Sequence, residues 1–356
     1  MKDHFSRRTR QYFLGRLLVL AGLVPYGLIA DDSQYNPWQS LGPAGTYVRV
    51  VRIDPLTPTT IYAGLVADDG HPFGGVYKSL DGGNTWAAMN NGLPNSPGIY
   101  ALTMDPTNSS TIYVGIENYG VGGGVYKSTD GGNSWNATGL PTGFGVYAVA
   151  VNPALPTTLY AGTDNWGLWS STDGGMTWTN NNSGLPLASI ISLAVDPQTV
   201  SKMYAGTSGA GLFSSNDGGN TWNDANNGLP GGANIATIVI KPLTTSTLYV
   251  GVDGYSSMGG GGVFKSTDGA NSWNDSNNGF PTNNGVLTIA IDPVTLTNIY
   301  AASFGAGAFK STDGGNSWTD FNAGLLDPLV HSIAINPQTP TSIYAGTCNT
   351  GVYLTQ

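Results

Sequence analysis

A box of eight residues recurs six times along the chain, and this regular repetition limits the fold more than any other feature of the sequence. The first copy reads SLDGGNTW, and successive Asp residues of the box are 49, 43, 44, 51 and 45 residues apart. A repeat of this length buries a core only by stacking on its neighbours. The repeated Asp and Trp positions are Asp81, Asp130, Asp173, Asp217, Asp268 and Asp313, with Trp86, Trp135, Trp178, Trp222, Trp273 and Trp318.

Two further markers divide each repeat into four short strands, which we name A to D in chain order. An alternating apolar segment ends in an x-Pro pair seven times, from Asp54-Pro55 to Asn336-Pro337, and a segment such as IYAG follows each pair. In the second repeat we expect strands A to C at 100–104, 111–114 and 124–127, with strand D beginning near Trp135. Four antiparallel strands at this period are typical of one blade of a β-propeller.

The number of boxes and the number of strand pairs differ by one. The seventh repeat stops after its strand C at Gln356, and the segment 38–43 ahead of the first repeat resembles the strand D that begins at Trp86. An N-terminal strand that completes the last blade would remove an exposed sheet edge. The sequence therefore predicts an all-β fold: a seven-bladed β-propeller of four-stranded antiparallel blades, closed by an N-terminal strand.

The box resembles the Asp-box, or BNR repeat, of sialidases, xyloglucanase-type glycoside hydrolases, sortilin-like receptors and photosystem II assembly factors. The resemblance covers residues 37–356 and implies the propeller fold. It implies no single activity, because those families perform different functions on related propellers. The assembly factors use the propeller as a docking surface, but the basic patch expected of them has no counterpart in this sequence.

The box itself is interpreted as structural. Its Asp can accept backbone N–H groups, its glycines permit positive φ, and its Trp can pack between blades. No copy carries the additional carboxylates of a Ca²⁺ loop. Residues that bind a ligand are therefore sought where the repeat is irregular.

The N-terminal segment has the features of a secretory signal peptide. Five of the 13 basic residues precede residue 17, an apolar run of 14 residues follows at 17–30, and Asp31-Asp32 comes next. This run is shorter than the ~20 residues of a membrane-spanning helix. We expect cleavage after Ala30, with an uncleaved anchor as the alternative, and export by the general secretory or the twin-arginine route. The propeller domain is then 31–356, with a periplasmic, cell-surface or extracellular location.

The charge and the reactive side chains exclude several partners. From Asp31 onward there are 8 Lys and Arg against 21 Asp and Glu, a formal charge of −13. Nucleic acids and anionic membranes are therefore not expected as partners. The two histidines after the signal segment (His71 and His331) and the lone Cys348 do not provide a zinc site. We expect no metal, no cofactor, no membrane insertion after signal cleavage, and a monomer.

The loops that join strands B to C and D to A are the irregular part of the ring. They lie opposite the x-Pro turns and the boxes, and the B–C loops have 11, 9, 5, 5, 11, 5 and 5 residues. Carboxylates beside aromatic rings can bind a sugar by hydrogen bonds and stacking. The candidate ligand-binding residues in these loops are Trp166, Asp164, Glu117, Tyr119, Asp69, His71 and Tyr255.

Two hydrolase classes act on propellers with this repeat, and the sequence matches each of them only in part. Sialidases clamp a substrate carboxylate with three arginines, whereas only Arg49 and Arg52 follow the signal segment, and strand alternation would direct them to opposite faces. Xyloglucanase-type enzymes need two carboxylates at the scissile bond, which here would be Asp164 with Asp253, Asp68 or Glu117. Their two catalytic Asp residues lie on two facing propellers, and this chain has one.

The sequence thus favours an exported, non-catalytic propeller that binds a glycan or a protein through its B–C/D–A loop face. The alternative is a glycoside hydrolase of the xyloglucanase type.

Overall fold

The computed structural model describes residues 37–356 except 69, 118–121, 142, 255–259 and 282–283, and the ring belongs to the unit Tyr35–Gln356. The predicted signal peptide, Asp69, Tyr119 and Tyr255 lie outside the described residues. The described residues form 28 strands and no helix. No membrane-spanning helix is therefore found in this part of the chain.

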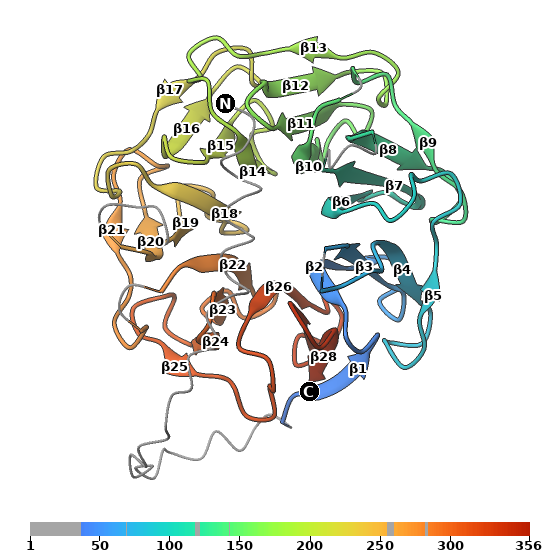
Figure 1. Ribbon diagram of the computed structural model, residues 1–356. Coiled ribbons are helices and arrows are strands. Elements are labelled where there is room, and N and C mark those ends of the chain that lie inside the picture. The colour runs from blue at the N-terminus through green and yellow to red at the C-terminus, as the bar shows by residue number, and fades with distance from the viewer. Residues whose placement is uncertain (1–36, 69, 118–121, 142, 255–259, 282–283) are drawn as a thin grey trace. The chain divides into compact units, whose positions relative to one another are not determined.

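The two inner strands of every blade are long and apolar. Strands A are β2 (Tyr47–Ile53), β6 (Ile99–Asp105), β10 (Val146–Val151), β14 (Ile190–Val195), β18 (Asn234–Ile240), β22 (Val286–Ile291) and β26 (Val330–Ile335). Strands B are β3 (Ile61–Val66), β7 (Asn108–Ile116), β11 (Leu159–Thr163), β15 (Met203–Thr207), β19 (Leu248–Asp253), β23 (Ile299–Ser303) and β27 (Ile343–Thr347). In Figure 1 the seven strands A line the inside of the ring.

The two outer strands are shorter. Strands C are β4 (Gly75–Ser79), β8 (Gly124–Ser128), β12 (Gly167–Ser171), β16 (Leu212–Ser215), β20 (Gly262–Ser266), β24 (Gly307–Ser311) and β28 (Val352–Thr355). Strands D are β5 (Ala87–Ala88), β9 (Asn136–Ala137), β13 (Thr179–Asn180), β17 (Asn223–Asp224), β21 (Asn274–Asp275) and β25 (Thr319–Asp320), with β1 (Gln39–Gly42) in the last blade. Each blade is one antiparallel sheet in the order A-B-C-D.

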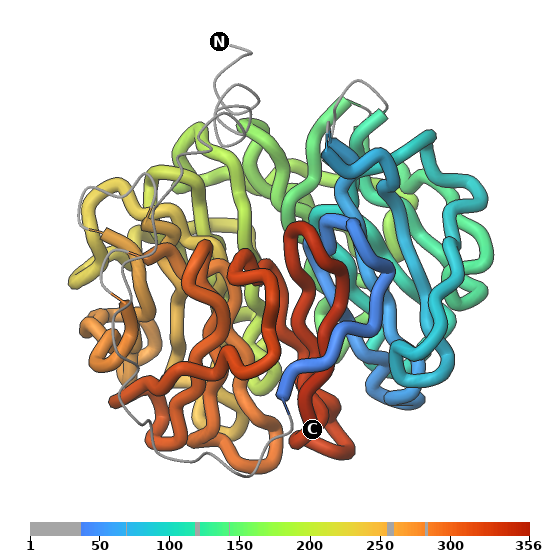
Figure 2. Tube along the Cα trace, turned by 60° about the horizontal axis from the view of Figure 1, so that its bottom comes forward, coloured from blue at the N-terminus to red at the C-terminus, as the bar shows by residue number. Residues whose placement is uncertain are grey.

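The ring closes as the sequence predicts. Strand β1 pairs with β28, with Gln39 opposite Leu354, so the last blade has the order β26-β27-β28-β1. Figure 2 shows this N-terminal strand beside the C-terminal strands. The Trp38 ring is buried, and its indole N–H donates to the carbonyl of Phe321 at 2.7 Å, which ties the N-terminal segment to the sixth blade.

The box is a hydrogen-bonded turn. In the second copy, Ser128 donates to Asp130 at 2.8 Å, and the backbone and hydroxyl of Ser134 donate to the same carboxylate at 2.9 and 2.6 Å. These hydrogen bonds, the Ser134 hydroxyl first, lower the pKa of Asp130 to about 2. Gly131 N–H also donates to Ser110 at the start of β7, at 3.0 Å. The box and the A–B turn therefore lie on one face of the blade.

Neighbouring blades are joined by basic and phenolic side chains of the repeat. Lys78 and Tyr62 of the first blade both donate to the carbonyl of Gly131 in the second, at 2.9 and 3.0 Å. Lys265 and Tyr249 make the same pair of bonds to Gly314. These lysines therefore stabilise the contacts between neighbouring blades.

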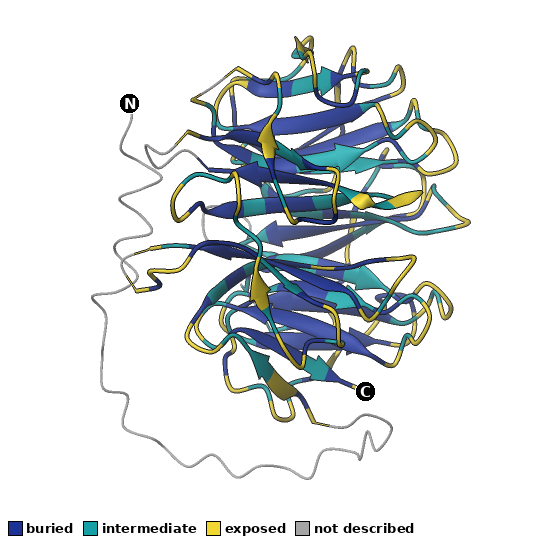
Figure 3. Cartoon of the chain, turned by 90° about the vertical axis from the view of Figure 1, so that its right-hand side faces the viewer, coloured by how far each residue is buried: buried dark blue, intermediate teal, exposed yellow. Residues whose placement is uncertain are grey.

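Figure 3 shows the buried strands inside and the exposed residues concentrated in the connecting loops.

Candidate functional site

Each strand A contains an irregularity at the same place, near its start. Its pairing with strand B skips one residue, which is the mark of a β-bulge, directly after the first buried aliphatic residue of the strand. A bulge removes that residue from the ladder and redirects its side chain. The seven bulge residues are Arg49, Tyr100, Tyr147, Ile191, Ala236, Leu287 and His331.

The bulge residues divide the ring into two parts. Ile191, Ala236 and Leu287 are aliphatic and lie on three consecutive blades, whereas the other four are polar or aromatic and also lie on consecutive blades. We call these four (His331, Arg49, Tyr100 and Tyr147) the polar arc. They come from β26, β2, β6 and β10, which follow one another around the inside of the ring in Figure 1.

The members of the polar arc contact one another across the blades. Arg49 Nη1 lies 3.0 Å from His331 Nδ1, and the Arg49 guanidinium carbon lies 5.2 Å from the centre of the Tyr100 ring. Tyr100 packs edge-to-face on Tyr147, with 5.3 Å between ring centres. The arc is therefore a continuous row of contacts.

Electrostatics fix the protonation of the central pair. Burial, followed by the charge of Arg49, lowers the pKa of His331 well below its usual value. His331 is thus neutral near pH 7, and its Nδ1 accepts a hydrogen bond from Arg49. Burial opposes the charge of Arg49, but the phenol oxygens of Tyr47 and Tyr100 and the carboxylate of Glu117 outweigh it and raise its pKa.

Glu117, one of the candidate ligand-binding residues, has a buried side chain. Tyr147 of the polar arc donates to its Oε1 at 2.8 Å. Glu117 directly follows β7, and its carboxylate points toward Tyr147 on strand β10. The sequence could not place it because the partner, Tyr147, is 30 residues away and belongs to the next blade.

The other candidate carboxylates on this face also hold loops together. Asp164 accepts from Asn165 at 2.6 Å and from Ser189 of the following D–A loop at 2.9 Å. Asp68 Oδ1 accepts from the backbone N–H of His71 and lies 2.8 Å from its ring Nδ1. Asp253 ends β19 opposite Asn234. Among the described residues, no group of three potential metal ligands comes together.

Among the described tryptophans, Trp166 is the most exposed, at 58%. It packs on Phe144 of the preceding D–A loop with 5.0 Å between ring centres, and Phe144 packs on Trp169 of β12 at 5.7 Å. The planes within each pair differ by 35° and 32°. Trp166 is thus the exposed end of a row of three rings, beside Asp164.

Sequence reasoning missed the residues that connect these features. Tyr100, Tyr147 and Phe144 belong to no motif, and Arg49 was considered only as part of an arginine clamp. In a regular strand, residues an odd number apart point to opposite faces. The bulge at Arg49 interrupts this alternation, because Val48 and Val51, three residues apart, both lie against Gly346. Comparing the seven strands A position by position could have identified the polar arc, since one position holds unlike residues directly after an aliphatic residue in every repeat.

The described structure resembles solved β-propellers. A GH74 xyloglucanase of Xanthomonas campestris superposes with a TM-score of 0.71 at 20% identity, covering 90% of this chain and 53% of the xyloglucanase. The chain therefore spans about half the length of that enzyme. YCF48 bound to D1 peptide superposes with a TM-score of 0.64 at 18% identity, covering 90% of this chain and 96% of YCF48.

YCF48 of Cyanidioschyzon merolae has a TM-score of 0.60 at 18% identity, and covers 90% of this chain and 98% of its own. No protein-family model and no curated protein sequence matches the chain. At these identities the similarity shows the fold, a seven-bladed β-propeller.

Proposed function

We propose that the chain is a non-catalytic binding propeller whose ligand lies on the B–C/D–A loop face and contacts Trp166. The exposed end of the Trp166–Phe144–Trp169 row carries this proposal. A large exposed indole costs solubility and adds nothing to the core, whereas it offers a flat apolar surface to a ligand. Export to the periplasm, the cell surface or the medium is part of the proposal.

A glycan suits this surface better than a protein segment. A pyranose ring can stack on Trp166, and the half-buried Asp164 beside it can accept hydrogen bonds from hydroxyls. Ser189 and Asn165 already hold the Asp164 carboxylate, so it keeps one orientation in the absence of a ligand. A protein partner is the other possibility, and YCF48 with its D1 peptide is a precedent for peptide binding by a propeller.

Hydrolysis is the second candidate, because the fold is that of the GH74 xyloglucanases. A glycosidase needs two carboxyl groups on either side of the bond, one of them protonated. On this face Glu117 is buried against Tyr147, and Asp164 and Asp68 are engaged by loop residues. These contacts favour a role of the carboxylates in positioning loops over a role as general acid or base.

A glycan array with the purified chain 31–356, followed by titration of any glycan that binds, tests the proposal. Trp166→Ala should weaken binding by about 1–2 kcal/mol, which is about a fivefold to thirtyfold increase in Kd. Leu187→Ala is the matched control, since Leu187 lies in the next D–A loop with 95% exposure and outside the aromatic row. Equal affinities of the wild type and Trp166→Ala would refute the proposed site.

Asp164→Asn separates binding from hydrolysis. An amide still hydrogen-bonds hydroxyls, so a binding protein should retain most of its affinity. A hydrolase would release reducing sugar from the bound glycan and would lose turnover by orders of magnitude in this variant. If the wild type releases reducing sugar and Asp164→Asn does not, the protein is a hydrolase and the binding proposal is refuted.

A further inference from the structure

A second candidate site lies on the opposite face of the propeller, the face that carries the x-Pro turns. A pocket of about 310 Å³ is formed there between the sixth, seventh and first blades. This volume is at the small end of the range of about 300–1,000 Å³ for small-molecule sites. The lining consists of Arg52, Ile53, Ala290, Ile291, Pro293, Ile333, Ala334, Ile335 and Pro337.

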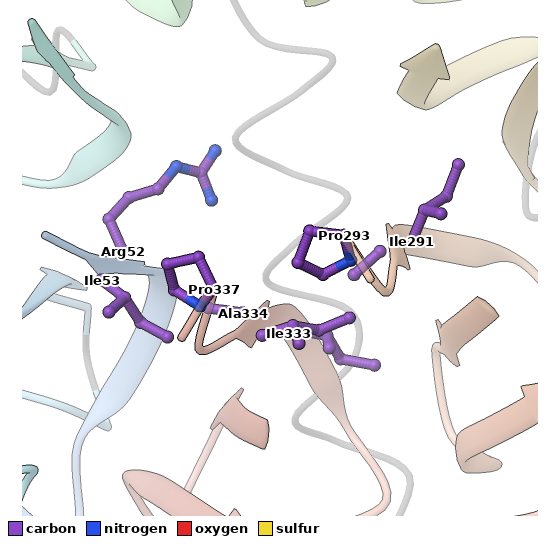
Figure 4. A pocket seen from close by; sticks show the side chains of 9 residues that line it. Arg52, Ile53, Ile291, Pro293, Ile333, Ala334 and Pro337 are labelled. Atoms are coloured by element: carbon purple, nitrogen blue, oxygen red, sulfur yellow. The ribbon is translucent and has the colours of Figure 1, made fainter. Parts of the chain in front are cut away.

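Arg52 is the one polar side chain in this lining. Figure 4 shows it extending from β2 toward the space beside Pro337 and Pro293, with Ile333 and Ile291 on the far side. The remaining lining side chains are aliphatic, and none is aromatic. The pocket thus combines one cation with a wall that offers no other side-chain hydrogen-bond donor or acceptor.

Arg52 interrupts the repeat. The six residues at the same register of the other strands A are small or aliphatic and uncharged: Thr103, Ala150, Ala194, Val239, Ala290 and Ala334. The propeller therefore forms without a charge at this position. Arg52 is an unrepeated feature of a repeated scaffold, as Trp166 is on the opposite face.

The charge of Arg52 lacks a counterion among the described residues. Its Nη1 donates to the carbonyl of Val51 on its own strand at 3.1 Å, and no carboxylate lies within ion-pair distance of it in this part of the chain. The neighbouring strands lower its pKa by desolvation, but the Arg52 side chain is exposed to solvent. An anion can therefore reach the guanidinium from outside. In a chain rich in acidic residues, this arrangement favours an external anion.

We propose that this pocket binds a small aliphatic carboxylate, with the carboxylate on Arg52 and the hydrocarbon chain against the isoleucines and prolines. The planar fork of a guanidinium matches a carboxylate with two parallel hydrogen bonds. The aliphatic wall provides the surface that an unbranched chain buries. A sugar would find no aromatic ring to stack on, and a polyanion would be repelled by the acidic body.

Titration calorimetry of the purified chain 31–356 with hexanoate, octanoate and decanoate tests this site. Affinity should rise roughly threefold to fourfold with each methylene until the pocket is filled. Arg52→Gln should weaken decanoate binding at least tenfold, and Arg52→Lys, which keeps the charge without the fork, should weaken it less. Ala334→Leu, which fills the pocket without changing charge, should also weaken binding at least tenfold.

Lys241→Gln is the matched control, because it removes one positive charge from the same face outside the pocket lining and should leave affinity unchanged. Thermal melts of all variants verify folding. Absence of decanoate binding by the wild type would overturn the proposal, as would equal binding of octylammonium and octanoate. Equal losses in Arg52→Gln and Lys241→Gln, full affinity in Ala334→Leu, or tighter binding of an acetylated peptide ending in isoleucine would also overturn it.

Discussion

Truncation of Trp135 should cost far more stability than truncation of Trp166, since one ring belongs to the architecture and the other to the loop face. Trp135 is 3% exposed and packs with Tyr62, Ile112 and other residues between the first two blades. Its indole N–H donates to the carbonyl of Met89 in the preceding blade at 2.8 Å. Trp135→Ala should therefore cost about 3–5 kcal/mol, the range for large aromatic deletions in cores.

About 1 kcal/mol of that loss should come from the hydrogen bond to Met89, and the rest from the cavity. Trp166, at 58% exposure, should cost less than about 1 kcal/mol, because it loses only its contact with Phe144. Trp178 is a useful intermediate: it is half-buried, and its indole bonds to Gly175 of its own box at 3.1 Å. Its loss should fall between the other two.

Urea denaturation followed by far-ultraviolet circular dichroism measures these losses, since the readout does not depend on the tryptophans that are removed. The midpoint should fall for Trp135→Ala with an unchanged slope. Equal losses for Trp135→Ala and Trp166→Ala would show that the exposed row is part of the packing and would remove the basis for a ligand there. A lower slope would show that the first two blades unfold separately.

Two further outcomes are expected from the closure of the ring and from its boxes. Deleting residues 31–45 removes β1 and exposes the edge of β28, so the cooperative melt should be lost or the protein should oligomerise; an unchanged melt with a monomeric sedimentation profile would contradict this. Hydrogen bonds lower the pKa of Asp81, Asp130, Asp217 and Asp313 to about 2, against the opposing effect of burial, which is largest at Asp313. The stabilisation that these carboxylates give is therefore present above about pH 4 and is lost as the pH falls toward 2. Melting temperatures measured from pH 6 to pH 2.5 should show the decline, and Asp130→Asn should make it shallower.

The architecture could be predicted because the pattern of strands and x-Pro turns occurs seven times in the sequence. A strand misjudged in one repeat is corrected by the same strand in the others, and the expected strand 124–127 differs from β8 by one residue. Closure by an N-terminal strand followed from the missing strand D of the last blade, and the pairing of β1 with β28 confirms it.

The site could not be predicted to the same depth, because its contacts join different blades through residues that occur once. No local pattern indicates that Phe144 packs on Trp166, or that Tyr147 bonds to Glu117. Strict alternation would direct Arg49 and Arg52 to opposite faces of the strand, but the bulge at Arg49 adds one residue and interrupts the alternation. A bulge of this kind leaves no mark in a single copy.

The bulges also explain how a repetitive ring can carry unlike residues around its axis. A residue in the ladder must fill the space between blades, so its size is fixed by both neighbours. A bulge residue is released from that requirement, which is why Arg49, Ile191 and Ala236 occupy equivalent positions without disturbing the sheets. Further along the strand, Arg52 reaches the opposite face while its equivalents stay small. The two faces thus vary independently on one scaffold, so a ligand on the Trp166 face would leave the Arg52 pocket open to another.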